Sequence, residues 1–269
     1  GGLGLGLIEA ALVAVELGRA NLSEPIADTA LVAAPLLDTA QQEKIAAGAL
    51  KVALAHPINP FIADLDQADL VLNGGAVAPP PTSPQPLQSI DPLRHLFAPL
   101  GNAAEDDRML DRAALIAAAQ LIGGAERMLE LATDYACTRE QFGQQIGRFQ
   151  AIKHHLASVA VKLEFARPVL WRAAYAAENG HARASIHISH AKVAATDAAM
   201  LAAETAIQVH GAMGYTYEVD LHFWMKRAWA LAGAWGDRAF HQRRVENAVV
   251  GATMAIGPEH IFESELIHG

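Results

Sequence analysis

Small and apolar residues recur at intervals of three and four through the second half of the chain, and this spacing limits the folds that the sequence can adopt. Over 149–178 it continues without a break through Ile152, Leu156, Val159, Leu163, Ala166, Leu170, Ala173 and Ala177. The same spacing runs through 105–137, apolar residues recur every seventh position through 181–210, and a shorter segment covers 236–251. Such spacing places the apolar residues on one face of an α-helix. The sequence therefore predicts a mainly α fold in which four antiparallel helices form a bundle with a seam of small residues.

Composition excludes several classes of protein. Hydrophobic residues make up 52% of the 269 residues and aromatic residues only 6%, which favours alanine-rich helices over sheets. The formal net charge of -9 argues against a nucleic acid or an anionic membrane as the main partner, because both require basic surfaces. No uncharged apolar run is long enough for a membrane span, and no signal-peptide pattern is visible. The single cysteine, Cys137, cannot form an internal disulfide, and we therefore expect a cytoplasmic protein.

The first half of the chain is less regular than the second. Amphipathic patterns predict short helices over 7–20, 27–38 and 41–50. Short apolar runs at 51–57 and 68–72 predict strands, and the later run APPPTSPQP cannot form a helix or a central strand, because proline lacks the amide donor. We therefore expect four regions, which are a partial N-terminal helical domain (1–50), a reduced β region with a proline-rich linker (51–104), the four-helix bundle (105–252) and a tail (253–269).

The connection REQFGQQIGRFQ, residues 139–150, lies between two of the predicted long helices. Backbone N–H groups at the start of the following helix, together with Arg139, would suit a diphosphate, and Phe142 could lie against a planar ring. On spacing alone, the more common structure is a plain helix-to-helix loop with a surface arginine and a buried phenylalanine.

A second segment, QVHGAMGY at 208–215, follows another predicted helix. Its glycines, Gly211 and Gly214, are typical of a helix stop. Glycines also let the backbone approach a ligand closely. By itself this segment favours the helix stop.

Together the two segments resemble the FAD contacts in the C-terminal helical bundle of acyl-CoA dehydrogenases. That family has an Arg-x-x-Phe-Gly loop and a later Gln-x-x-Gly-Gly-x-Gly segment, which reach the diphosphate and adenosine of FAD held mainly by a neighbouring subunit. At the matching positions Ala212 replaces one family glycine, and the resemblance is close over 105–251. It implies FAD as the cofactor, with contacts from Arg139, Gln141, Phe142, Gln150, Gln208, His210, Gly211 and Gly214.

The sequence departs from this family where the flavin ring and the substrate are contacted. Ala55-His56-Pro57 stands where the family has Thr-Glu-Pro, in a shortened β region. The catalytic glutamate, which removes the α-proton of the substrate, is also replaced, because its two family positions align with Trp235 and Ala113. Asp237 and Asp111 are close in sequence to these positions, but aspartates there are more typical of helix caps or of the surface. We therefore assign no catalytic base in this chain.

By resemblance, the chain is similar to the shortened subunit of actinobacterial acyl-CoA dehydrogenases that act on sterol side-chain CoA thioesters. Those enzymes pair a shortened chain with a complete, base-bearing chain in an α2β2 heterotetramer. The resemblance implies a homologous full-length subunit as partner, an acyl-CoA substrate with a bulky acyl group, and an electron-transfer acceptor. Two alternatives stay open: a self-sufficient homotetramer with Asp111 or Asp237 as a displaced base, and a helical scaffold that binds no flavin.

Histidines and paired basic residues give weaker signals. His187 and His190 have a spacing that could bind a metal, but no third ligand stands out, so we predict no metal site. The pairs Lys226-Arg227 and Arg243-Arg244 are most simply interpreted as solvated faces or intersubunit contacts.

Overall fold

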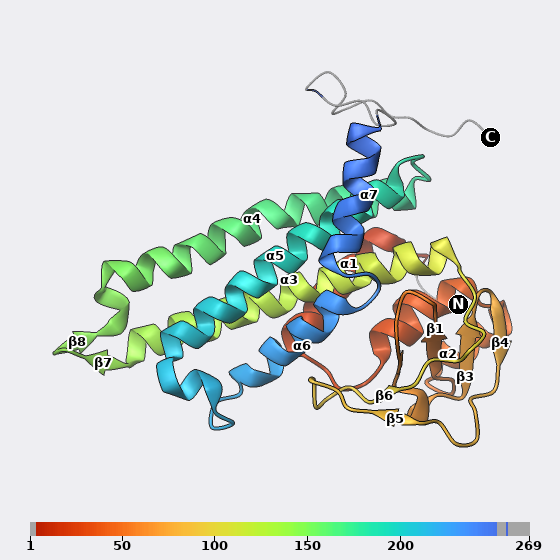
Figure 1. The fold of residues 1–269 in the computed structure, drawn as a ribbon, viewed down its shortest axis with the longest axis horizontal. Helices are drawn as coiled ribbons and strands as arrows, with labels where there is room; N and C mark the ends of the chain where they lie inside the picture. Colours follow the sequence, from red (N-terminus) through yellow and green to blue (C-terminus); the bar gives the residue numbers. More distant parts are fainter. Residues whose placement is uncertain (1–3, 252–256, 258–269) are drawn as a thin grey trace.

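Three long helices dominate the computed structural model, which describes residues 4–251 and Gly257. They are α3 (Asp107–Thr138), α4 (Gln150–Glu178) and α5 (Ala184–His210), and they lie side by side along the long axis of the molecule (Figure 1). Each of these helices falls on a segment where the apolar spacing predicted one. The mainly α fold is confirmed.

The start of α3 is fixed by a side-chain cap. Both backbone N–H groups of Arg108 and Met109 donate to the carboxylate of Asp106, at 3.0 and 3.1 Å. Such a cap satisfies amide groups that have no partner within the helix. The helix then continues to Thr138, with a buried face made largely of alanine, glycine, leucine and isoleucine.

The first helix, α1 (Leu7–Ala20), packs across α3 and confirms the helix predicted there. A Cβ atom at Gly123 of α3 would collide with the backbone carbonyl oxygen of Val15. The two backbones therefore touch where the helices cross, and only glycine fits there. Because of this contact, α1 shares one continuous apolar core with the bundle.

The helices predicted over 27–38 and 41–50 are only partly correct. The structure has instead a π-helical segment, a 3₁₀ turn and a short α-helix, which are η1 (Ala27–Ala33), η2 (Ala34–Leu36) and α2 (Thr39–Ala46). The side chain of Asp38 accepts a hydrogen bond from Gln41 N at 2.8 Å, so the cap sets the start of α2 two residues earlier than predicted. After this helix the chain turns at Gly48, which has a φ of +70°.

Two helices rather than one complete the C-terminal part, namely α6 (Leu221–Gly233) and α7 (Arg238–Val250). The segment predicted over 236–251 corresponds to α7, whereas α6 was not predicted. Its buried residues Leu221, Met225, Ala228 and Leu231 have helical spacing, but the aromatic and basic residues between them obscure it in the sequence. Helix α6 packs against α3 and α5.

The interpretation of Lys226-Arg227 as a solvated face is wrong for Arg227. This side chain is buried, and its Nε atom donates to the buried carboxylate of Asp91. Its Nη1 atom donates to the carbonyl oxygen of Leu22 at 3.1 Å. The reason is the packing of α6 into the molecule, which turns one of the two basic residues inward.

The β region forms two small sheets, each with three strands. The strands are β1 (Val52–Ala55), β2 (Ile62–Ala63), β3 (Leu70–Asn73), β4 (Ala76–Ala78), β5 (Pro86–Leu87) and β6 (Leu96–Phe97). Strands β1 and β3 are parallel, with Val52 opposite Leu70, and they confirm the two predicted strands. The proline-rich stretch ends at β5, which lies at the edge of its sheet, where proline is tolerated.

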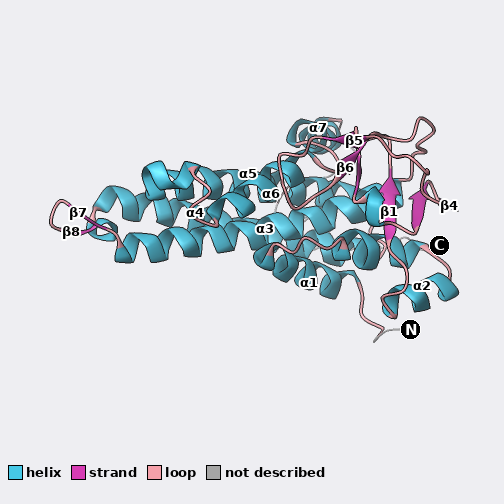
Figure 2. Ribbon diagram, turned by 90° about the horizontal axis from the view of Figure 1, so that it is seen from below, coloured by secondary structure: helices cyan, strands magenta, loops and turns pink. Residues whose placement is uncertain are grey.

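These strands gather at one end of the molecule (Figure 2). A short hairpin of β7 (Glu140–Gln141) and β8 (Gln144–Gln145) marks the opposite end. None of the helices between residues 4 and 251 combines the length and the apolar character that crossing a bilayer requires. The predicted tail, 253–269, lies outside the described residues apart from Gly257.

Candidate functional site

The first sequence motif folds into a tight hairpin beyond the end of α3. Strands β7 (Glu140–Gln141) and β8 (Gln144–Gln145) pair in antiparallel fashion around a two-residue turn. Both turn residues, Phe142 and Gly143, have positive φ values, +54° and +79°. Two-residue hairpins with positive φ at both positions follow the natural twist of the strands. Glycine adopts this conformation readily, whereas a residue with a bulky side chain is strained there.

Phe142 is the most exposed large apolar residue in the described chain, with 92% of its surface open to solvent. Its ring meets that of Phe149 edge to face, with ring centroids 6.1 Å apart. With only this edge contact, an exposed aromatic ring on a strained backbone adds little to the stability of this chain. Such a ring is available for contact with another molecule.

The second motif begins where α5 ends. Gly211 has φ +63° and ψ -136°, a combination that residues with a Cβ atom avoid. The chain then makes a 3₁₀ turn, η5 (Gly211–Tyr215). At Gly214 a Cβ atom would lie 2.8 Å from the carbonyl oxygen of Ile207, so the turn folds back closely onto α5. Both predicted glycines are thus required by the backbone.

Packing between α3 and α5 brings the two motifs to the same end of the bundle (Figure 1). The rings of Tyr135 and His210 stack with centroids 4.3 Å apart. The hydroxyl of Tyr135 also donates to the sulfur of Met213 at 3.7 Å. His210 is buried, and its Nδ1 atom lies 2.8 Å from the carbonyl oxygen of Ala206. This histidine therefore holds the two helix ends together, and its predicted contact with FAD stays a prediction.

The remaining predicted cofactor residues are exposed at this end. Arg139 lies at the end of α3, Gln208 is in the last turn of α5, and neither side chain has a hydrogen bond or ion pair within the described residues. Gln150 opens α4, and the Gln141 amide donates only to the neighbouring carbonyl of Glu140, at 2.7 Å.

The start of α4 is electrostatically suited to an anion. No side chain caps this helix, and its first turn contains no acidic residue. The free N–H groups and the helix dipole give such a helix start a partial positive charge. Arg139, Arg148 and Lys153 add cationic side chains from the same stretch of sequence. This end of the bundle can therefore bind a negatively charged group.

The two positions that the resemblance assigns to the catalytic glutamate lie elsewhere, and neither carries an ionisable group. Ala113 is buried in α3, and Trp235 is buried in the turn between α6 and α7. Asp237 caps α7, since its carboxylate accepts a hydrogen bond from Phe240 N at 2.7 Å.

Asp111 differs from the expected cap or surface residue. It is largely buried, accepts a hydrogen bond from the hydroxyl of Ser185, and forms an ion pair with Arg244 at 3.0 Å. The interpretation of Arg243-Arg244 as a solvated pair is therefore wrong for Arg244. Asp111 links α3 to α5 and α7, and this arrangement occupies its carboxylate.

The turn that carries Trp235 is held by a buried lysine that sequence analysis missed. Lys192 of α5 is fully buried, and its ammonium group lies 2.9–3.3 Å from four backbone carbonyl oxygens, those of Leu231, Ala232, Ala234 and Gly236. Burial lowers the pKa of Lys192 to about 7. A lysine in an alanine-rich helical segment gives no sequence signal of such a role.

Two further side chains fix the backbone of Trp235, which has a φ of +59°. Its N–H donates to the amide oxygen of Asn59 at 2.8 Å. Its carbonyl oxygen lies 2.9 Å from Nε2 of His241, whose Nδ1 lies 3.1 Å from the hydroxyl of Ser189. Burial, with the nearby charge of Lys192 as a second cause, lowers the pKa of His241 to about 4. We call Lys192, Asn59, Trp235 and His241 the Trp235 corner.

His56, at the family's Thr-Glu-Pro position, lies beside this corner. Its ring centroid is 6.2 Å from that of Trp235. Both of its ring nitrogens face backbone N–H groups, those of Ile58 at 3.2 Å and Asp106 at 3.3 Å. His56 is therefore engaged in holding the backbone. No group of side chains in the described part of the chain is arranged to hold a metal ion.

The chain is similar to known proteins over most of its length. The family model "Acyl-CoA dehydrogenase, C-terminal domain" matches residues 106–249. Acyl-CoA dehydrogenase IpdE2 of Mycobacterium tuberculosis is 36% identical over 262 residues, which cover 93% of this chain and 80% of that protein.

Solved structures share the fold. In the ChsE4-ChsE5 complex from Mycobacterium tuberculosis, the aligned chain superposes with a TM-score of 0.78 at 22% identity, covering 94% of this chain and 82% of that one. A Tcur3481-Tcur3483 steroid acyl-CoA dehydrogenase variant superposes with a TM-score of 0.81 at 21% identity, covering 93% of this chain and 83% of that one. The family model and the identity to IpdE2 show that this chain belongs to the acyl-CoA dehydrogenase family.

Proposed function

We propose that this chain is the subunit of an FAD-dependent acyl-CoA dehydrogenase that binds the diphosphate and adenosine side of FAD but lacks the catalytic base. The observation that carries the proposal is the exposed end of the bundle. There Arg139 and Gln208 have no hydrogen bond or ion pair within the described residues, and Phe142 is 92% exposed. At the same time Ala113 and Trp235 leave the two base positions without a carboxylate.

The residues at this end fit FAD. The uncapped start of α4 and Arg139 would hold the diphosphate through N–H groups and a guanidinium. Phe142 and the close approach permitted at Gly211 would hold the flat adenosine part. When bound, FAD supplies the acceptor for a hydride from the acyl chain. The role of this chain is to bind and orient the cofactor.

Removal of the α-proton then requires a carboxylate from another subunit. Asp237 caps a helix and Asp111 is paired with Arg244, so neither carboxylate is available as a base. We propose a homologous full-length subunit as the source, in an α2β2 heterotetramer. The structural likeness to a chain of the ChsE4-ChsE5 complex supports a heteromeric assembly.

We further propose a cytoplasmic enzyme for α,β-dehydrogenation of an acyl-CoA with a bulky, steroid-type acyl group, which passes electrons to a separate acceptor. The likeness to a steroid acyl-CoA dehydrogenase supports this class of substrate. The short strands of the β region, two to four residues each, would leave more room for the acyl group than a full domain would.

The test is substitution of Arg139 in the co-expressed complex. Arg139→Ala should lower the affinity for FAD by at least about tenfold, as expected for the loss of a charge-assisted contact, while leaving the folded chain intact. Arg243→Ala, an exposed arginine on α7, is the matched control and should leave the flavin content unchanged.

Two results would favour the alternatives. Dehydrogenase activity of the chain alone that is lost in Asp237→Asn or Asp111→Asn would indicate a self-sufficient enzyme. Absence of flavin from every complex, with assembly unaffected by Arg139→Ala, would indicate a scaffold.

A further inference from the structure

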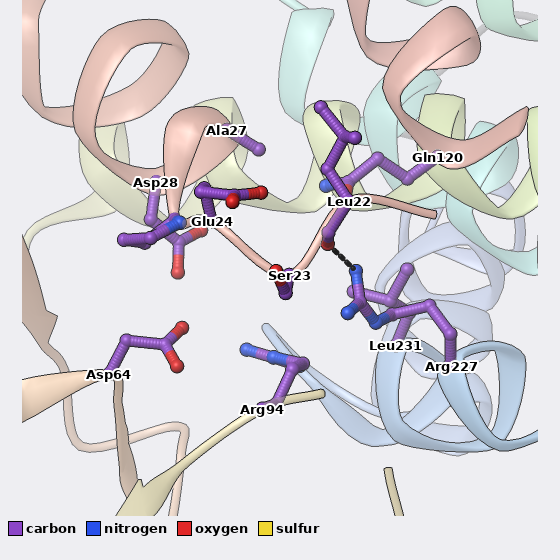
Figure 3. Close-up of a pocket in the computed structure, with 11 residues that line it drawn as sticks. Leu22, Ser23, Glu24, Ala27, Asp28, Asp64, Arg94, Gln120, Arg227 and Leu231 are labelled. Atoms are coloured by element: carbon purple, nitrogen blue, oxygen red, sulfur yellow. Dashed lines mark hydrogen bonds between the residues drawn. The ribbon is translucent and has the colours of Figure 1, made fainter. Parts of the chain in front are cut away.

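A small cavity lined by polar and apolar residues lies between the N-terminal helices, the β region, α3 and α6 (Figure 3). None of the residues proposed to contact FAD lines it. Its volume of about 30 Å³ corresponds to about two or three water-sized positions. The residues around it that carry polar or charged side chains are Ser23, Glu24, Asp28, Asp64, Arg94, Gln120 and Arg227.

Two buried arginines leave N–H groups unpartnered at this cavity. Arg94 and Arg227 each expose only 8% of their surface. Arg227 donates through Nε to Asp91 and through Nη1 to the carbonyl of Leu22, but its Nη2 has no partner in the described chain. Nη1 of Arg94 is equally without a partner there, and its guanidinium points into the open space (Figure 3). Unpaired N–H groups of a buried cation are costly, so an acceptor is expected in this space.

Two carboxyl groups face the arginines across the cavity (Figure 3). Asp28 comes from η1, and Asp64 comes from the turn after β2 with a left-handed φ of +52°. Burial raises the pKa of both carboxyl groups, and the guanidinium of Arg94 partly opposes this. A protonated carboxyl group can donate a hydrogen bond instead of accepting one.

The charge balance decides which ligand fits. Arg94, Arg227 and the paired Asp91 sum to one positive charge when Asp28 and Asp64 carry protons, and to one negative charge when both are ionised. Other charged groups also lie nearby: Glu24 is exposed at the rim, and Lys51 lies beside Asp28 and Asp64 in an adjoining hollow. His95, which follows Arg94, is exposed and pairs with Asp66. An anion therefore fits the protonated form of the cavity and is repelled by the ionised form.

We propose that this cavity binds a small carboxylate anion of formate or acetate size, taken up together with protons. The carboxylate oxygens would accept hydrogen bonds from Arg94 and Arg227, the geometry that guanidinium groups prefer. Asp28 and Asp64 in protonated form would donate to the same anion. The inner volume of the cavity matches a free one- or two-carbon carboxylate.

The test is titration of the full chain with sodium formate, replacing sodium gluconate at constant ionic strength. Gluconate is too large for the cavity and corrects for general salt effects. Binding is followed by calorimetry and by the thermal midpoint, in mildly acidic and in mildly alkaline buffer. We expect saturable stabilisation by formate, with an affinity that rises by up to about tenfold for each pH unit of acidification per linked proton.

Two variants and a control locate the site. Arg94→Gln should weaken formate binding at least about tenfold, whereas Arg108→Gln, an arginine whose side chain is 82% exposed, should not. Asp64→Asn keeps the acceptor for the 3.1 Å hydrogen bond from His95 N and suits the left-handed backbone. It should bind formate more tightly in alkaline buffer and show a weaker dependence on pH.

If formate shows no saturable binding in the acidic buffer and none in the alkaline buffer, the proposal is wrong and the cavity holds water. Binding that Arg108→Gln weakens as much as Arg94→Gln would overturn it as well. If Arg94→Gln does not fold, Asp64→Asn decides alone, and an unchanged pH dependence in that variant contradicts the assignment.

Discussion

Lys192 and Gln208 belong to the same helix, about 24 Å apart along its axis, yet their surroundings have opposite character. Lys192 is fully buried and surrounded by backbone carbonyl groups of this same chain. Gln208 is exposed at the end of the bundle that also carries Arg139, Phe142 and Gly211, which we call the hairpin end. Phe142 projects into solvent there. The Trp235 corner thus satisfies its polar groups internally, whereas the hairpin end leaves its groups open.

This difference separates a region whose polar groups are hydrogen-bonded within the chain from a region whose polar groups are open to another molecule. The resemblance to acyl-CoA dehydrogenases places one catalytic glutamate at the turn between α6 and α7, where the chain has Trp235 held by hydrogen bonds with Asn59 and His241. The hairpin end presents the residues that we propose contact a cofactor, and its exposed side chains, those of Arg139, Phe142 and Gln208, add little to the stability of this chain. We interpret the corner as a structural element of this chain's own core, and the hairpin end as a surface for another molecule.

The largest effect is expected at the corner. Lys192→Met removes the donor for four carbonyl groups and should lower the free energy of unfolding by about 3–5 kcal/mol, since several buried acceptors lose their partner at once. Urea unfolding measures this change. Lys162→Met is the control, because that side chain is 45% exposed in a surface pair with Asp197 and should cost less than about 1 kcal/mol. An equal loss of unfolding free energy in both variants would show that the buried ammonium group of Lys192 stabilises the chain no more than an exposed one.

Acid should destabilise the chain through the same corner. Because the pKa of His241 falls from 6.5 to about 4 on folding, the unfolded chain binds a proton first, and stability is lost as the pH drops through this range. The loss amounts to about 3 kcal/mol at most. His241→Gln should flatten the dependence of unfolding free energy on pH between these values, whereas His154→Gln on the exposed side of α4 should not. An unchanged slope in His241→Gln would contradict the buried, neutral state of this histidine.

A smaller effect is expected where α5 meets the hairpin end. Gly211→Ala should lower the free energy of unfolding by about 1–3 kcal/mol, because the backbone conformation there excludes a Cβ atom. No neighbouring atom lies within 4 Å of that Cβ, so the cost comes from the backbone alone. The control is Gly233→Ala at the end of α6, which has equal space and no left-handed φ, and which should be neutral or stabilising by up to about 1 kcal/mol. Chemical unfolding of both variants makes the comparison.

The smallest effect on stability has the opposite sign. Phe142→Asn creates the turn Asn-Gly, which is favoured in two-residue hairpins, and should raise the free energy of unfolding by about 0.5–1 kcal/mol. The same variant should lose FAD from the co-expressed complex. Tyr175→Asn, another exposed aromatic residue on α4, should leave FAD bound. Destabilisation by Phe142→Asn would show that the ring belongs to this chain's own packing.

The long helices could be predicted because a single rule, apolar spacing, governs buried faces of regular helices. It located α4 to within a residue at each end. The same rule failed for α6, where His222 and Arg227 lie among the buried residues and interrupt the apolar spacing. It also failed for η1, whose π-helical hydrogen bonding has no distinct sequence pattern.

The candidate site was predictable only where residues form a local motif. Arg139, Phe142 and Gly211 stand in short segments, and the structure brings their segments to one end of the bundle. Lys192 acts on carbonyl groups 39 to 44 positions away, and backbone carbonyls leave no trace in a sequence. The pair of Asp91 and Arg227, 136 positions apart, depends on tertiary packing in the same way.

The central claim is that this chain supplies only the diphosphate and adenosine side of the FAD site. The most direct test is to measure the flavin content and the native mass of this chain, alone and co-expressed with a homologous full-length subunit. The account predicts a colourless chain when it is purified alone. In the complex it predicts one FAD for each pair of unlike chains. A lone chain that is yellow, tetrameric and active on an acyl-CoA would contradict the account, because all parts of the site would then have to come from this sequence.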